Sequence, residues 1–486
     1  MRLQELLKDV QVTEIHADLN LEIPAVAYDS RKVTKGCMFV AISGFASDGN
    51  RFVPMAMEKG AAVVVTAVKP EQDVPYVLVS EDRLALAMIS ANYFGRPAEK
   101  MQIIGVTGTN GKTSVTLLLK QVLEKTLGAK VGLIGTMENQ IGDWVIPTER
   151  TTPESYALQE LFAQMVESGC GYVVMEVSSH ALALERVGGI FFRAAAFTNL
   201  TEDHLDFHKT MEAYCQAKAE LFRRCGQAVI NTDDPYAGQM LAAASCPVLT
   251  VGEGENARLQ ATEIQLASDH VSFTARLDNE KVPVRVPIPG RFTVYNTLTV
   301  LGLAWVLGVP LGDAAGALAE AAGVRGRIEV VPTPGTDYTV LVDYAHTPDG
   351  LENVLRSVKD FCRGRVIAVF GCGGDRDPMK RPIMGEIGVR LADFAVITSD
   401  NPRTEAPMAI IQDILKGVSP ELGEYTVIEE RRKAIRYAMD IAKKDDIIVL
   451  AGKGHETYQE IMGVKHHLDE REEVQAHLQE LRTNHG

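Results

Sequence analysis

The sequence lacks the features that mark secreted, metal-thiolate and membrane-spanning proteins. Its seven cysteines are an odd number without a Cys-x-x-Cys pair, which favours reduced thiols over a disulfide framework or a thiolate metal site. No apolar run reaches the ~18 residues of a transmembrane helix, and the first residues lack the apolar core of a signal peptide. We therefore expect a cytoplasmic protein without membrane insertion.

An excess of positive charge is also absent. The 486 residues include 49 basic and 64 acidic side chains, which gives a formal net charge of -15. General binding to nucleic acids or to anionic membranes requires basic surfaces, so we expect neither. A local basic pocket for an anionic small molecule is compatible with this composition.

The residues that are present fit an α/β protein of three domains. The content of 46% hydrophobic and 23% charged residues is ordinary for a globular protein, and ~150 residues per domain predicts about three domains. Short apolar strands alternate with helical patterns, which predicts parallel sheets, whereas residues 261–289 alternate like antiparallel strands. From glycine- and proline-bearing stretches we expect boundaries that give domains at residues 1–98, 99–328 and 329–486.

A glycine-rich turn between a predicted strand and a predicted helix is the most informative segment. It reads Gly105-Val-Thr-Gly-Thr-Asn-Gly-Lys-Thr-Ser114. The backbone N–H groups of such a turn bind phosphate at the helix N-terminus, where Lys112 would reach the β- and γ-phosphates and Thr113 would hold Mg²⁺. Val106 stands where the strict P-loop pattern has its first glycine, and Gly105 lies one residue too early. The strand and the helix on either side still predict an ATP site.

Two further segments carry acidic and imidazole side chains. Glu176 ends an apolar run and would lie at the carboxyl end of a parallel strand, where nucleotide-binding folds place a ligand of Mg²⁺. The alternative is a strand-end carboxylate in solvent. Residues 199–208 are dense in carboxylates and imidazoles, which fits either a metal site or a solvated turn.

Lys218 lies on an unusual helical face. It shares that face with apolar residues at positions 211, 214, 215, 221 and 222, where a bare ammonium is costly to bury. The side chain would either extend to solvent or have its charge paired or chemically changed. A neutral lysine amine can add CO₂ to become a carbamate, and that anion would suit a Mg²⁺ site.

Motifs spread over nearly the whole chain agree on one family. In the central part they are Gly108-Thr-Asn-Gly-Lys-Thr-Ser114, Glu176-Val-Ser-Ser-His180, Asn199 with Asp203-His204, Lys218-Ala-Glu-Leu-Phe222, Tyr295-Asn296, Gly326-Arg327 and Asp343-Tyr-Ala-His-Thr-Pro348. Near the ends they are Asp29-Ser-Arg31 with the loop Gly44–Gly49, Gly371-Cys-Gly-Gly-Asp-Arg-Asp377, Asp400-Asn-Pro-Arg403 and Gly452-Lys-Gly-His-Glu456. Together these motifs resemble the Mur ligases, the ATP-dependent amide ligases that build the stem peptide of peptidoglycan.

The resemblance implies a fold and a reaction. The fold would have a UDP-binding N-terminal α/β domain, a central P-loop domain with a parallel sheet, and a Rossmann-like C-terminal domain that binds an amino acid. The enzyme would be a monomer that uses ATP and Mg²⁺. It would join meso-diaminopimelate to UDP-N-acetylmuramoyl-L-alanyl-D-glutamate through an acyl phosphate, during the synthesis of peptidoglycan precursors.

The resemblance also implies roles for individual residues. The nucleotide would be bound by Gly108, Thr109, Asn110, Gly111, Lys112, Thr113, Ser114, Asn296, Arg327 and Asp343. The catalytic residues would be Lys112, Glu176, His204 and Lys218, and the Mg²⁺ ligands would be Thr113, Glu176, His204 and carbamylated Lys218. The acceptor would be bound by Ser30, Thr151, Thr152, Ser178 and Arg186. The amino acid would be bound by Arg376, Asp400, Asn401, Pro402, Arg403, Gly452 and Glu456.

Several alternatives stay open at this point. Thr151, Thr152 and Ser178 could serve only as turn or cap residues. Within the ligases, an L-lysine-adding enzyme and a folylpolyglutamate synthase-like enzyme are alternatives. Arg403 favours diaminopimelate over lysine, because a guanidinium matches the additional carboxylate of diaminopimelate with two hydrogen bonds. A P-loop switch or motor, which would hydrolyse ATP without joining substrates, is the alternative from another class.

Overall fold

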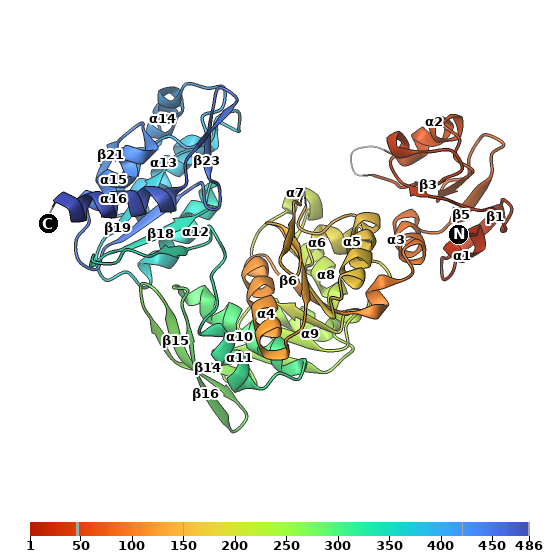
Figure 1. Ribbon diagram of the computed structural model, residues 1–486, viewed down its shortest axis with the longest axis horizontal. Coiled ribbons are helices and arrows are strands. Elements are labelled where there is room, and N and C mark those ends of the chain that lie inside the picture. The colour runs from red at the N-terminus through yellow and green to blue at the C-terminus, as the bar shows by residue number, and fades with distance from the viewer. Residues whose placement is uncertain (45–47, 149, 420, 485–486) are drawn as a thin grey trace. The chain divides into compact units, whose positions relative to one another are not determined.

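The structure, a computed structural model, describes residues 1–44, 48–148, 150–419 and 421–484 (Figure 1). Part of the expected UDP-binding loop, residues 45–47, lies outside this description. The described chain forms two compact units, residues 1–260 with 298–314 and residues 261–297 with 315–486. The boundaries expected near residues 98 and 328 stay a prediction.

The first sheet of unit 1 has five strands with a buried layer on each face. In spatial order the strands are β1 (Val12–His16), β5 (Tyr76–Val79), β4 (Val63–Thr66), β3 (Met38–Ala41) and β2 (Val26–Ala27). All pairs are parallel except β1 with β5. Because side chains alternate along a strand, Val63 and Val65 pack with α1 (Leu3–Leu6) and α3 (Asp82–Tyr93), whereas Val64 packs with α2 (Val53–Glu58).

The second sheet of unit 1 carries the glycine-rich turn. Six parallel strands run in the order β13 (Val248–Gly252), β12 (Ala228–Asn231), β11 (Ala194–Phe197), β6 (Gln102–Thr107), β10 (Tyr172–Glu176) and β7 (Val131–Ile134). β8 (Asn139–Ile141) and β9 (Trp144–Ile146) continue the sheet as antiparallel strands. The parallel strands are buried almost throughout, as expected where helices cover both faces.

The helices of this part connect the strands. They are α4 (Lys112–Leu127), α5 (Ser155–Glu167), α6 (Ser179–Ala183), α7 (Leu205–His208), α8 (Met211–Ala219) and α9 (Ala237–Ala243). The helix predicted around Lys218 is confirmed as α8, and a 3₁₀ turn, Glu220–Arg223, continues it. Three elements span the boundaries between the units: β14 (Leu259–Leu266), whose first residues pair with β13, α10 (Arg291–Val306) and α11 (Leu311–Leu318).

Unit 2 contains a hairpin and a second doubly covered sheet. The hairpin joins β15 (Val271–Leu277) and β16 (Glu280–Val286), which confirms the antiparallel strands predicted there. The sheet runs in the order β17 (Glu329–Val331), β18 (Thr339–Asp343), β22 (Ile447–Ala451), β19 (Val366–Phe370), β20 (Phe394–Ile397) and β21 (Tyr425–Val427), and only β17 is antiparallel. The strands predicted at β18, β19, β20 and β22 are therefore confirmed.

Helices cover both faces of this sheet. α12 (Pro348–Lys359), α13 (Lys380–Leu391) and α14 (Pro407–Leu415) pack on one face, and α15 (Arg431–Ile441) and α16 (Glu470–Asn484) pack on the other. Unit 2 also contains a separate hairpin of β23 (Tyr458–Ile461) and β24 (Val464–His467). The carboxyl ends of the four central parallel strands lie at one edge, which is where such folds bind ligands.

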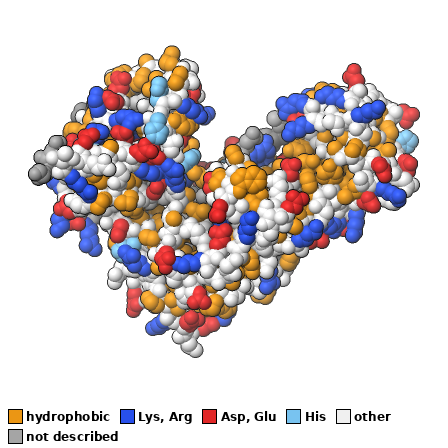
Figure 2. Space-filling model, in the orientation of Figure 1, with side chains coloured by type: hydrophobic (Ala, Val, Ile, Leu, Met, Phe, Trp, Pro, Cys, Tyr) orange, Lys and Arg blue, Asp and Glu red, His pale blue; other side chains and the backbone are white. Residues whose placement is uncertain are grey.

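The described residues include no helix that is long and apolar enough to cross a membrane. All seven cysteines are free thiols, as the sequence predicts. Acidic and basic side chains intermingle on the face shown in Figure 2.

A buried ion pair links α15, α16 and the end of β22. The guanidinium of Arg431 and the carboxylate of Glu470 are both 0% exposed, with 2.7 Å between Nη2 and Oε1. Nη2 of Arg431 also donates to the carbonyl of Ala451 at 2.8 Å. The pair therefore ties two helices to the strand that precedes Gly452.

Replacing Arg431 by methionine should destabilise unit 2 by about 3–5 kcal/mol, because the carboxylate of Glu470 would stay buried without its partner. The matched control is Lys433→Met on the same helix, where the pair with Glu430 is exposed and contributes under ~1 kcal/mol. Thermal unfolding of the full chain measures both. Equal shifts in Tm for the two variants would contradict this account.

Candidate active site

The glycine-rich turn lies between β6 and α4, as predicted. Gly108 has φ +148 and Gly111 has φ +85, a region that favours glycine. A Cβ atom on Gly108 would lie 1.9 Å from Oγ1 of Thr198, so this position also has no room for a side chain. Gly111 caps α4 without a side chain, which leaves the helix N-terminus available to an anion.

Lys112 and Thr113 begin α4 and point to two different partners. Nζ of Lys112 donates to the carbonyls of Gly108 and Thr109, each at 2.9 Å. Oγ1 of Thr113 donates to Oε1 of Glu176 at 2.9 Å. The cation therefore lies against the turn, and the hydroxyl lies against the strand-end carboxylate.

The Glu176 carboxylate is buried at the end of β10, and only 1% of the residue is exposed. The alternative of a carboxylate in solvent is therefore wrong. Besides the hydrogen bond from Thr113, the Glu176 carboxylate accepts hydrogen bonds from the backbone N–H of Thr136 at 2.9 Å and from Oγ1 of Thr136 at 3.0 Å. Neighbouring hydroxyl and carboxylate oxygens are the donors that Mg²⁺ prefers, so this pair fits that ion.

Lys218 is also buried, at 1% exposure, so the alternative of a side chain extending to solvent is wrong. Its Nζ donates to the carbonyl of Gly108 at 2.8 Å and lies 4.6 Å from the ring centre of Tyr214. Burial, and then the charge of Lys112, hold the pKa of the Lys218 ammonium well below its usual value. A bare ammonium does not fit a cation site, but a neutral amine here could be modified.

The structure separates the imidazoles of residues 199–208. The side chain of His204 is 45% exposed, and its Nδ1 lies 3.4 Å from Oδ1 of Asp203. His208 is buried, with Nε2 2.9 Å from Oγ of Ser179, and burial lowers the pKa of its imidazole to about 4. The ring of His180 lies between them, 4.9 Å from His204 and 5.5 Å from His208. Sequence reasoning did not select His180 or His208.

No group of three or more His, Cys, Asp or Glu side chains in the described ranges could hold a metal by itself.

Four of the five residues expected to bind the acceptor form a hydrogen-bonded group next to Glu176. Oγ1 of Thr152 donates to the Glu176 carbonyl at 2.8 Å and accepts from the Ser178 N–H at 3.1 Å. Nη1 of Arg186 donates to the Thr152 carbonyl at 3.2 Å. Thr151 reaches the same region, with 3.0 Å between its Oγ1 and that of Thr136. The Ser178 hydroxyl oxygen accepts from the N–H of Ala181 and so caps α6, and its role as an acceptor ligand stays a prediction.

Ser30, the fifth, is buried in the 3₁₀ turn Ser30–Lys32, which follows β2 of the five-stranded sheet. Beside Arg186 the structure adds two residues that the sequence did not suggest. Arg83 on α3 and Arg186 both face the carboxylate of Glu154, at 3.4 and 3.5 Å. Residues 83 and 154 are too far apart in the chain for any local pattern to pair them.

Three of the residues predicted to bind the nucleotide lie in unit 2. Asp343 ends β18, and its two carboxylate oxygens accept from the N–H groups of Ile328 and Ala345, each at 2.8 Å. Burial raises the pKa of this carboxyl. The guanidinium of Arg327 lies 5.5 Å from the ring centre of Tyr344, and Asn296 is buried on α10.

The residues expected to bind the amino-acid substrate lie at the carboxyl ends of β19, β20 and β22. Gly374, after β19, donates its N–H to the Asn401 carbonyl at 2.9 Å, and a Cβ there would lie 2.0 Å from the Pro402 carbonyl oxygen. A Cβ on Gly452 would lie 2.4 Å from Oδ2 of Asp400. Glycine therefore lets the three loops approach one another. Arg376, after β19, is exposed.

A buried lysine that the sequence did not single out connects these loops. Nζ of Lys453 is 3.1 Å from Oδ1 of Asn401, 3.0 Å from Oε2 of Glu456 and 3.9 Å from Oδ1 of Asp400. Nδ2 of Asn401 donates to the same Glu456 oxygen at 2.9 Å. Arg403 lies at the edge of this network with φ +51, and its Nη1 donates to the Gly374 carbonyl at 2.7 Å.

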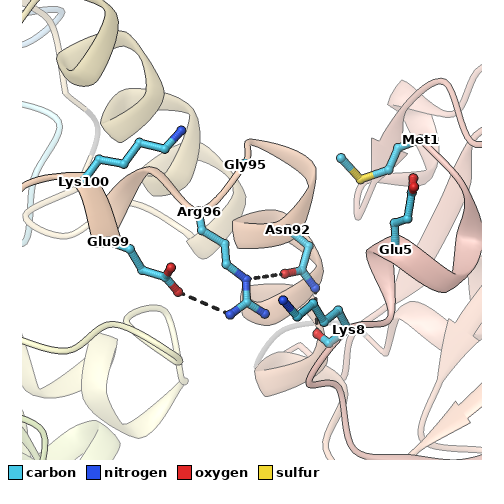
Figure 3. A pocket seen from close by; sticks show the side chains of 8 residues that line it. All are labelled: Met1, Glu5, Lys8, Asn92, Gly95, Arg96, Glu99 and Lys100. Carbon is cyan, nitrogen blue, oxygen red and sulfur yellow. Dashed lines mark hydrogen bonds and ion pairs between the residues drawn. The ribbon is translucent and has the colours of Figure 1, made fainter.

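A separate cavity of about 480 Å³ lies near residues 92–100 (Figure 3). Its walls include Glu5, Lys8, Asn92 and Arg96, none of which was expected in the site. The Arg96 guanidinium donates hydrogen bonds to the side chains of Asp9, Asn92 and Glu99. The cavity is therefore distinct from the residues described above.

Replacing Gly108 by alanine should lower the affinity for nucleotide by at least about tenfold, because the turn must move to make room for the methyl group. Isothermal titration calorimetry with ATP and Mg²⁺ measures the change. Gly171→Ala is the matched control, since a Cβ there meets nothing within 4 Å. An unchanged affinity in Gly108→Ala would contradict the assignment of the phosphate site.

Three family models match the chain in order. They are "Mur ligase family, catalytic domain" at residues 22–94, "Mur ligase middle domain" at residues 106–304 and "Mur ligase, glutamate ligase domain" at residues 326–454. The predicted fold class, three α/β domains with large parallel sheets, is thereby confirmed.

Full-length relatives agree with the family models. UDP-N-acetylmuramoyl-L-alanyl-D-glutamate–2,6-diaminopimelate ligases of Clostridium botulinum and Caldanaerobacter subterraneus are 47% and 49% identical, over 99% of this chain and 100% and 99% of theirs. A solved structure with the same ligase name is 31% identical, with a TM-score of 0.77 over 99% of both chains. The chain belongs to the Mur ligase family.

Proposed function

We propose that this Mur ligase adds meso-diaminopimelate to UDP-N-acetylmuramoyl-L-alanyl-D-glutamate and releases ADP and phosphate. The observation that carries the proposal is the full-length similarity to relatives named as 2,6-diaminopimelate ligases of this acceptor. The reaction would supply peptidoglycan precursors in the cytoplasm and so serve cell-wall synthesis, cell shape and division. The enzyme would act as a monomer with domains at residues 1–98, 99–328 and 329–486.

The chemistry explains the need for ATP. A carboxylate is a poor electrophile, so the γ-carboxylate of the D-glutamate first attacks the γ-phosphate of ATP and ADP leaves. The acyl phosphate that forms has a good leaving group. The amine of diaminopimelate then adds to the carbonyl carbon, phosphate departs, and the amine loses a proton as the amide forms. Excluding water from the site protects the acyl phosphate from hydrolysis.

The glycine-rich turn, residues 108–114, would hold the phosphates of ATP, with Lys112 adding positive charge at the transferring group. Mg²⁺, when bound, supplies further charge neutralisation there. Thr113, Glu176, His204 and a carbamate on Lys218 are its proposed ligands. Asn296, Arg327 and Asp343 are the proposed contacts of the rest of the nucleotide.

The proposed carbamate rests on the burial of Lys218. An amine whose ammonium form is disfavoured by burial is nucleophilic and can attack CO₂, forming an N–C bond and releasing a proton. The product is an anion in place of a cation. Its location beside Gly108, at the start of the phosphate turn, is one where a negative charge could bind Mg²⁺.

Ser30, Thr151, Thr152, Ser178 and Arg186 are proposed to bind the acceptor. The hydrogen bonds from Thr152 to the Glu176 carbonyl and from Arg186 to the Thr152 carbonyl support this proposal, because they bring polar groups next to Glu176. For the amino acid, Arg403 is proposed to bind the far carboxylate, Gly452 and Glu456 the far amine, and Arg376 the carboxylate beside the reacting amine. Asp400, Asn401 and Pro402 would shape the turn that presents Arg403.

The first test is the release of phosphate with each substrate omitted in turn. The enzyme should release phosphate rapidly only with ATP, the UDP-dipeptide and meso-diaminopimelate together, and L-lysine should replace the last poorly. Arg403→Ala should reduce the preference for meso-diaminopimelate about ten- to a hundredfold, the contribution of one charge-assisted pair.

Arg356→Ala, an exposed arginine of α12, is the control for the Arg403 variant. Phosphate release without acceptor would favour a P-loop switch or motor. Equal use of L-lysine by the unmodified enzyme would favour the lysine-adding ligase and overturn the assigned amino acid.

Lys218→Ala should lower the rate by about ten- to a hundredfold or more, since it would remove one ligand of Mg²⁺. A short carboxylate such as acetate should restore part of the activity by occupying the vacated space. Lys69→Ala, at an exposed lysine between β4 and β5, is the control. Full activity of Lys218→Ala, or a crystal structure of the active enzyme with an unmodified amine, would contradict the carbamate.

A further inference from the structure

The Arg403 guanidinium has an acidic neighbour on the β23–β24 hairpin. Its Nε lies 3.6 Å from Oε2 of Glu460, and the two side chains are 24% and 27% exposed. This separation is that of an ion pair without a hydrogen bond. In the part of the chain that the structure describes, no group donates a hydrogen bond to the Glu460 carboxylate. Glu460 therefore presents an incompletely satisfied anion beside Arg403.

Arg403 does not depend on the Glu460 side chain for its position. Its Nη1 donates to the Gly374 carbonyl at 2.7 Å. Its backbone N–H donates to the Glu460 carbonyl at 3.0 Å, and its own carbonyl accepts from the N–H of Met462 at 2.6 Å. These bonds involve Gly374 and backbone groups of the β23–β24 hairpin, so a change of the Glu460 side chain leaves them in place.

The other acidic residues of this site are already paired. Oε2 of Glu456 accepts from Nζ of Lys453 and Nδ2 of Asn401, and Asp400 lies 3.9 Å from the same ammonium. Glu460 shares only the amide of this network, since its backbone N–H donates to Oδ1 of Asn401 at 3.0 Å. Its carboxylate is thus the one in the cluster that Lys453 does not neutralise.

We propose that Glu460 binds the far ammonium of the amino-acid substrate, next to the far carboxylate on Arg403. The inference rests on the proposed function. In diaminopimelate the far ammonium and the far carboxylate share one carbon, so a carboxylate held by Arg403 places the ammonium within a few ångströms of it. Glu460 lies at that distance. An ammonium has three donors, so Glu460 can act together with Gly452 and Glu456.

The Arg403–Glu460 pair is therefore complementary to a zwitterion and not to a single charge. L-Lysine offers an ammonium but no carboxylate to Arg403. L-2-Aminopimelate offers the carboxylate but no ammonium to Glu460. Each half of the pair makes its own contribution to selection, and the two can be separated with these two amino acids.

The experiment compares Glu460→Gln with the unmodified enzyme, using meso-diaminopimelate and L-2-aminopimelate as alternative substrates. Glu460→Gln should lower kcat/KM for meso-diaminopimelate about tenfold or more, mainly through KM, because a charged hydrogen bond is lost. It should change kcat/KM for L-2-aminopimelate less than about twofold. Glu472→Gln, an exposed glutamate of α16 paired with His467, is the matched control.

Two results would overturn the inference while leaving the proposed function intact. An equal loss with both substrates would mean that Glu460 acts only on Arg403 or on folding. No loss with either would mean that the carboxylate has no role. Failure of the unmodified enzyme to use meso-diaminopimelate would instead overturn the proposed function, and the inference with it.

Discussion

The buried carboxylate of Glu176 is the interaction on which the site in unit 1 depends. It accepts hydrogen bonds from Thr113 at the start of α4 and from Thr136 beyond β7, and its backbone carbonyl accepts from Thr152. One residue at the end of β10 thus connects the phosphate turn to the segment proposed for the acceptor. The register of β10 with β6, Glu176 opposite Val106, places it there. A parallel sheet provides such a position because neighbouring strands end at the same edge.

In unit 2 a buried cation, the ammonium of Lys453, connects the loops of the site. Lys453 follows β22 and binds Asn401 and Glu456, which lie in two different loops. Arg431, paired with Glu470, donates a hydrogen bond to the last residue of β22. Both cations are buried, and both are balanced by acidic partners. The loops that present Arg403 and Glu456 are therefore held by charge–charge contacts as well as by close backbone approaches at glycine.

Much of this arrangement could be predicted from the sequence. The apolar strands, the glycine-rich turn and the helical face of Lys218 follow from local patterns, so their structures agree with expectation. Contacts that join distant segments could not be predicted in this way. Arg83 with Glu154, and Arg403 with Glu460, are separated by 71 and 57 residues, and no periodicity relates them. The sequence showed Lys453 only as one residue of a motif. Its burial could not be predicted, because burial of a side chain depends on tertiary packing.

The burial of Lys218 also has a consequence for how the chain can evolve. An amine enclosed by apolar side chains lowers the free energy of unfolding, since its charged form must lose hydration when the chain folds. Apolar substitutions of similar size at this position should give a more stable chain. Selection for stability and selection for the site act in opposite directions at this one residue. Under the role proposed for Lys218, the lysine persists only while the cell requires the reaction.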